Sequence, residues 1–165
     1  MLVLACCMLL IFSWSILWFF QKMPGWLPFL PLWEVLSIFA YTQMFALLES
    51  LFVLLLLVLL AVILPPRFFR DSFVAQGSIL LFIAAFWIIL FQSIWFNVVE
   101  WAAGKLFLWF TLALLTVLIS CFLVHRSKRL QRVLNAVADR ISVFLYLYVP
   151  LGTLGLVVVI ARNVL

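Results

Sequence analysis

The sequence predicts an all-α, polytopic membrane protein, with five transmembrane helices in a single domain over residues 1–165. The first observation is composition: 70% of the residues are hydrophobic and 9% are charged, whereas soluble domains carry about 25% charged residues. The second is the arrangement of the apolar residues in five long segments. Because each backbone N–H and C=O in hydrocarbon must be satisfied within its own helix, these segments are expected to be helical. We assign the net charge of +5 to cytoplasmic loops and expect no nucleic-acid partner.

The first predicted span covers residues 2–20, which contain no charge and suffice to cross a hydrocarbon core of about 30 Å. It has neither a basic leading region nor a polar cleavage region, so we expect an uncleaved span and not a signal peptide. Residues 23–33 follow, with three prolines and two tryptophans. They are expected to be non-helical and to lie along the membrane interface. A partner-binding loop is the alternative.

The second predicted span, residues 35–64, belongs to the longest apolar segment, which starts at Trp33 and ends before Pro65-Pro66. A helix over the 32 residues 33–64 reaches about 48 Å, so we expect it to tilt or to extend into a headgroup region. Glu49 is the one acid well inside a predicted span. An ionisable residue in hydrocarbon is costly and is by default a functional candidate. The alternative is a protonated or hydrogen-bonded glutamate that packs against a neighbouring helix.

The third predicted span, residues 78–99, is polar on one side of its second half. Consecutive helices are antiparallel, so this half shares a membrane face with the start of the second span, which is polar over an arc of about 140°. We expect a hydrogen-bonded seam or a small wet cavity between the two helices that opens outward. A seam that only holds the helices together is the alternative. The predicted seam comprises Glu34, Tyr41, Glu49, Gln92, Asn97 and Glu100.

The fourth predicted span covers residues 106–124 and contains few polar side chains. Thr116 and Ser120 form a pair of small residues four apart, a pattern that favours close packing against another helix.

An amphipathic helix is predicted over residues 127–141, between the last two spans. Its apolar residues recur at helical spacing and form a stripe about 100° wide, with basic residues outside it. Such a helix is expected to lie on the anionic inner leaflet and to contact lipid headgroups. Docking to a soluble partner or to another subunit is the alternative. The basic face comprises Arg126, Lys128, Arg129, Arg132 and Arg140.

The fifth predicted span covers residues 142–161. Pro150 removes a backbone donor within it, so a kink is expected. Gly152 and Gly155 follow within two turns and would let a neighbouring backbone approach closely.

Orientation follows from the basic residues on alternate sides of the predicted spans. The side that holds the N-terminus and residues 65–77 and 125–141 carries seven lysines and arginines, and the other side carries three. The excess predicts a cytoplasmic N-terminus and an outer C-terminus. We expect a bacterial cytoplasmic membrane or an organelle inner membrane.

Few side chains carry chemistry. The single histidine, His125, excludes haem held by two histidines of one chain. It could ligate one pigment or contact a lipid phosphate, and an interfacial histidine is the alternative. Cys6, Cys7 and Cys121 show no metal-ligand spacing and are interpreted as packing residues. The cofactor is unknown, with bound lipid or pigment as candidates, and we expect no catalytic residue and no metal site.

Three functions remain open from the sequence. The first is a non-catalytic structural or assembly subunit of a larger membrane complex, such as a respiratory or photosynthetic one, with the bilayer and other membrane subunits as partners. The second rests on topology alone: five spans and an outer C-terminus resemble the membrane part of lipoteichoic-acid-synthase-type enzymes, which implies a module serving an extracytoplasmic envelope-biogenesis enzyme. The third is a small transporter or proton-conducting subunit that uses Glu49.

Overall fold

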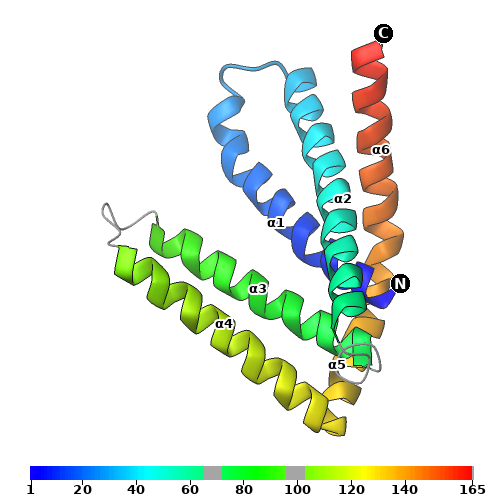
Figure 1. Cartoon of the computed structure of the whole chain (residues 1–165). Coiled ribbons are helices and arrows are strands. Elements are labelled where there is room, and N and C mark those ends of the chain that lie inside the picture. Colours follow the sequence, from blue (N-terminus) through cyan, green and yellow to red (C-terminus); the bar gives the residue numbers. More distant parts are fainter. Residues whose placement is uncertain (65–71, 96–102, 165) are drawn as a thin grey trace. The chain divides into compact units, whose positions relative to one another are not determined.

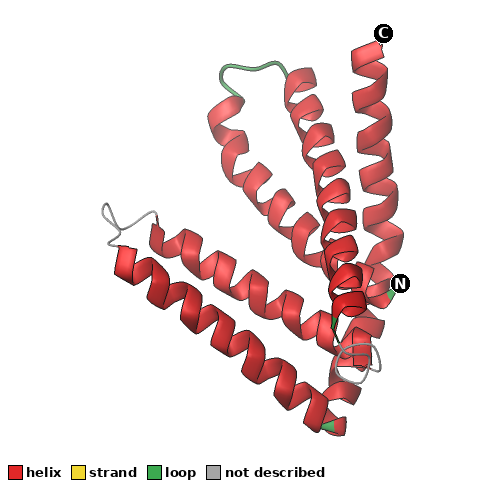
Figure 2. Ribbon diagram, in the orientation of Figure 1, coloured by secondary structure: helices red, strands yellow, loops and turns green. Residues whose placement is uncertain are grey.

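The computed structural model describes residues 1–64, 72–95 and 103–164, and every regular element in these ranges is a helix (Figure 2). Five helical segments of the described chain are long and apolar enough to cross a membrane, which confirms the predicted fold class. The elements are α1 (Leu2–Trp26), α2 (Leu32–Ile63), α3 (Phe73–Trp95), α4 (Ala103–Arg126), α5 (Lys128–Ile141), the 3-10 turn η2 (Ser142–Phe144) and α6 (Leu145–Val164) (Figure 1).

The helices belong to two compact units. Unit 1 comprises Met1–Leu60 and Asp139–Leu165, and therefore holds α1, most of α2, η2 and α6. Unit 2 comprises Ala61–Ala138 and holds α3, α4 and most of α5. The single domain over residues 1–165 stays a prediction.

The prediction for residues 23–33 was wrong at both ends. Helix α1 continues through Pro24 to Trp26, and α2 begins at Leu32. Pro24 removes one backbone donor close to the end of α1, while the N–H of Leu27 still donates to the carbonyl of Met23 at 3.1 Å. One lost bond in the last turn is a smaller penalty than exposing several backbone groups in an apolar medium. The non-helical connection is therefore confined to residues 27–31.

Unit 1 has a core in which α1 meets α6. The rings of Phe12 and Tyr148 stack with centroids 5.0 Å apart. The hydroxyl groups of Ser13 and Tyr148 lie 3.2 Å apart and are hydrogen bonded, so the buried tyrosine keeps a polar partner. Met8 and Ala46 complete this cluster, which ties α2 to the same core. Aromatic pairs of this kind add about 0.5–1.5 kcal/mol beyond the area that they bury.

Glycines set the distance between α2 and α6, which lie side by side in opposite directions (Figure 1). A Cβ added at Gly155 would lie 2.7 Å from the carbonyl oxygen of Ala40. One added at Gly152 would lie 2.9 Å from the Cβ of Leu47. The close approach predicted for these two glycines is confirmed. Helix α6 continues through Pro150, and the kink there stays a prediction.

In unit 2, α3 and α4 pack through tryptophans and a threonine. Trp87 Nε1 donates to Thr116 Oγ1 at 2.8 Å, and the Trp87 and Trp109 rings meet edge to face at 4.8 Å. The hydroxyl of Thr116 donates in turn to the carbonyl of Ala113 at 2.8 Å. Thr116 thus contacts another helix through a hydrogen bond that was not foreseen. Close packing through the pair Thr116 and Ser120 stays a prediction.

Helix α5 turns back onto the other two helices of unit 2. Leu134 is buried with Ala75 and Val124. Gln131 Nε2 donates to the carbonyl of Val124 at 2.9 Å, which pairs one of the carbonyls that the end of α4 leaves open. Both contacts hold α5 against the end of α4.

Candidate functional site

A pocket of about 270 Å³ lies between α2 and α6 in unit 1. Gly155, where an added Cβ would lie 2.7 Å from the carbonyl oxygen of Ala40, is part of its wall. The wall is almost entirely apolar, with two polar side chains from α2. The lining residues are Trp33, Leu36, Ser37, Phe39, Ala40, Gln43, Leu151, Leu154, Gly155 and Val158.

Gln43 is the unusual member of this wall. Its side chain is 1% exposed, and neither Oε1 nor Nε2 has a hydrogen-bond partner among the described residues. Leaving a buried polar group unsatisfied costs about 1–3 kcal/mol, so most buried amides are paired. The sequence analysis missed this residue. An amide within a long apolar run was the available signal, but the sequence does not show whether another helix supplies a partner.

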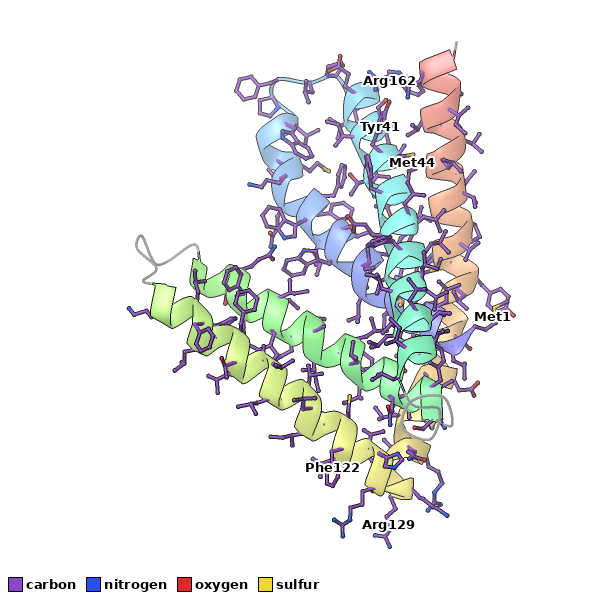
Figure 3. All side chains as sticks on the ribbon, in the orientation of Figure 1. Met1, Tyr41, Met44, Phe122, Arg129 and Arg162 are labelled. Atoms are coloured by element: carbon purple, nitrogen blue, oxygen red, sulfur yellow. The ribbon has the colours of Figure 1, made fainter. Side chains whose placement is uncertain are left out.

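A second polar contact joins α2 to the last turn of α6. Asn163 Nδ2 donates to the hydroxyl oxygen of Tyr41 at 3.0 Å, and the hydroxyl of Tyr41 lies 3.2 Å from Asn163 Oδ1. Tyr41, Met44 and Arg162 mark this part of unit 1 in Figure 3. Tyr41 is thus engaged with α6, a partner that the sequence analysis did not foresee.

The predicted seam between α2 and α3 involves both units. Glu34, Tyr41 and Glu49 belong to unit 1, and Gln92 belongs to unit 2, where its Oε1 is buried without a partner in the described residues. Asn97 and Glu100 lie outside the described residues. The seam therefore stays a prediction.

Glu49 is exposed on α2 and is not among the residues that line the pocket. Its neighbours along the same helix are large and apolar: Phe45, Leu48 and Phe52 are all exposed as well. A carboxyl group thus stands on an otherwise apolar surface of unit 1. Among the residues that the structure describes, none pairs with the carboxyl group of Glu49.

The predicted basic face consists of Arg126, at the end of α4, and four residues of α5. Arg126, Lys128, Arg129, Arg132 and Arg140 are all exposed, and Arg129 points away from the helix (Figure 3). The apolar stripe has two parts. Leu134 and Ala138 are buried in unit 2, whereas Leu130, Val133 and Val137 stay exposed beside the basic residues. The helix is therefore amphipathic as predicted, and its place at the membrane surface stays a prediction.

The candidates for cofactor chemistry are placed as follows. His125 lies in the last turn of α4 and is exposed. The three cysteines are buried, as expected for packing residues. Within residues 1–64, 72–95 and 103–164, no group of three His, Cys, Asp or Glu side chains could hold a metal ion. The role of His125 toward a pigment or lipid phosphate stays a prediction.

Fold and site together define a multi-pass helical membrane protein with a small apolar pocket and with an acid, Glu49, exposed on a helix that is long and apolar enough to cross a membrane. Comparisons of the chain with protein-family models, with curated proteins and with solved structures found no match.

Proposed function

We propose that this protein is a non-catalytic structural or assembly subunit of a larger membrane complex. The observation that carries the proposal is the exposed carboxyl group of Glu49 on the apolar surface of α2. An acidic residue at the centre of a membrane helix costs about 2.5–3.5 kcal/mol on insertion scales, and the cost is smaller for Glu49, which we expect about one turn inside the hydrocarbon. A polar partner on another helix offsets that cost.

The surroundings of Glu49 favour a helix as its partner. Phe45, Leu48 and Phe52 offer a broad apolar area around one polar group. Inter-helix contacts in membranes combine such packing with a few hydrogen bonds, each contributing about 0.6–2 kcal/mol. A neighbouring subunit with a donor at this level would cover the aromatic rings and pair the acid in one contact.

The proposal includes an orientation. The excess of basic residues favours a cytoplasmic position for the N-terminus and α5, in a bacterial or organelle inner membrane, and an outer position for the C-terminus. The exposed arginines and the exposed apolar residues of α5 then contact anionic headgroups and lipid chains together. This contact would hold the protein at a fixed depth beside its partners.

The test is purification of the tagged protein in mild detergent, with partners quantified by mass spectrometry. Wild type is expected to carry at least one partner subunit in stoichiometric amount. Glu49→Leu is expected to lose that partner severalfold, since the donor on the partner is left unpaired. Glu34→Leu is the matched control, because it removes the acid in the first turn of α2, which is fifteen residues before Glu49. A wild-type protein that carries lipid alone would refute the proposal.

Two further variants separate the remaining explanations. Glu49→Cys with Gln92→Cys, in a background without the three native cysteines, tests whether α3 of the same chain covers the acid. Rapid disulfide formation in membranes would remove the need for another subunit. Glu49→Gln keeps a hydrogen-bonding group but cannot carry a proton. Lost proton conduction with an unchanged partner would favour the transporter function.

A further inference from the structure

We propose that the exposed face of α2 around Glu49 binds the same face of a second copy of this chain, with the two Glu49 carboxyl groups paired across the contact. The inference rests on the proposed function, in which another helix covers Glu49, and it names that helix as α2 of a second copy. Two observations carry it: the spacing of the exposed side chains on α2, and the chemistry of the one carboxyl group among them.

The exposed side chains of α2 follow the spacing of a two-helix contact. Phe45, Glu49, Phe52, Leu56 and Leu59 are separated by four, three, four and three residues, and all five are exposed. Two positions in every seven residues keep one line of side chains facing a partner helix along a left-handed crossing. This is the commoner hand in membrane bundles. We call these five residues the heptad face.

The rest of unit 1 leaves the heptad face uncovered. Ser50 and Leu57 each follow a residue of this face by one position, about 100° around the helix, and they are 0% and 4% exposed. The hydroxyl of Ser50 is satisfied within α2, where it donates to the carbonyl of Ala46 at 2.7 Å. Helix α2 therefore packs into unit 1 through one side and presents large apolar side chains on another.

A carboxyl group in the heptad face can pair with its own copy. In its neutral form it has one O–H donor and one carbonyl acceptor, so two such groups satisfy each other. Glu49 occupies a position where a single polar residue fixes the register and the number of helices in a coiled coil. Copies of a membrane protein insert in one orientation, so a second α2 runs parallel and brings its Glu49 to the same depth. A two-fold axis between the copies then places the two carboxyl groups opposite each other.

A helix of a different protein has to meet two requirements at once. It must carry a hydrogen-bonding group at the depth of Glu49 and large apolar side chains at the matching spacing on either side. A second copy meets both requirements by identity. Phe45 and Phe52, which are 55% and 60% exposed, then pack beside the paired carboxyl groups and shield them from lipid.

The experiment places a photoreactive amino acid, p-benzoylphenylalanine, at position 56 of the full chain and identifies what it crosslinks in native membranes. Leu56 lies on the heptad face, seven residues after Glu49, and is 48% exposed. Position 51 is the matched control, because Leu51 is 46% exposed but lies about 120° around the helix from the middle of that face. Co-expressed copies with two different tags identify adducts between copies.

Association is then measured in lipid vesicles at several protein-to-lipid ratios. Glu49→Leu should weaken it at least about threefold, as expected for the loss of one inter-helix hydrogen bond in a membrane. Glu49→Gln should stay within about twofold of wild type, because an amide also donates and accepts.

We expect position 56 to crosslink two copies and position 51 to give no such adduct. Equal adducts between copies at both positions, or a Glu49→Leu variant that associates like wild type, would overturn the inference. A crosslink from position 56 to a different protein would also overturn it, but would leave the proposed function standing. Crosslinks to lipid alone or within one chain would overturn both.

Discussion

Replacing Gly155 by alanine should separate α2 from α6. The added Cβ would lie 2.7 Å from the carbonyl oxygen of Ala40 and 3.1 Å from the backbone nitrogen of Met44. Ordinary contact begins at 3.4 Å, so the backbones must move apart by about 3.4 − 2.7 = 0.7 Å. A gap of roughly 0.5–1 Å forfeits a quarter to a half of each dispersion contact along the interface.

The expected net effect of Gly155→Ala is a loss of roughly 1–2 kcal/mol in the free energy of unfolding. Overpacking costs about 1–3 kcal/mol, and the higher helix propensity of alanine offsets about 1 kcal/mol of it. The assay is equilibrium unfolding in mixed micelles, followed by circular dichroism. Gly104→Ala is the control, because nothing lies within 4 Å of the Cβ that it adds. If both variants unfold alike, the close approach of α2 and α6 is not what requires glycine.

Three further predictions follow from contacts within each unit. In unit 2, Trp87→Phe and Thr116→Val should show a coupling of about 0.6–2 kcal/mol in a double-mutant cycle of unfolding, because each removes one end of a hydrogen bond of 2.8 Å; additive effects would contradict it. In unit 1, Tyr41→Phe should lower unfolding stability by less than about 1 kcal/mol, because its bond to α6 is exposed; a larger loss would mean that the hydroxyl is better shielded than the structure shows. On α5, replacing Arg129 and Arg132 together by Gln should reduce the anionic lipid that copurifies, since each basic residue near a membrane surface contributes about 1 kcal/mol; an unchanged lipid profile would place α5 away from the headgroups.

Much of the fold could be predicted from the sequence because a membrane reduces the choice of structures. Long apolar segments have to be helices in hydrocarbon, which fixed five spans without knowledge of their contacts. The ends of the helices were harder to predict. A proline usually marks a helix boundary, but Pro24 lies within the last turn of α1, where few further backbone bonds depend on its missing N–H. Composition could not distinguish that position from a break.

The candidate site depended on information that one helix does not contain. Glu49 could be selected because an acid in an apolar run is costly wherever it points. Gln43 could not, since an amide is unusual only when its neighbours leave it unpaired, and that depends on Gly155 lying opposite. The two glycines were predicted to allow a close approach, but α2 as the partner, and an amide at that level, required the structure.

Four polar residues of α2 separate into two groups by the reach of their side chains. Thr42 Oγ1 donates to the carbonyl of Ile38, and Ser50 Oγ donates to the carbonyl of Ala46, each at 2.7 Å. A short hydroxyl side chain can thus satisfy itself on its own helix, four residues back, and needs no neighbour. Gln43 and Glu49 have longer side chains, and no described group pairs with Gln43. Polar residues of the second group remain in a membrane helix at a cost that something outside the helix must offset. For Glu49 we infer another helix, because it is exposed among large apolar side chains.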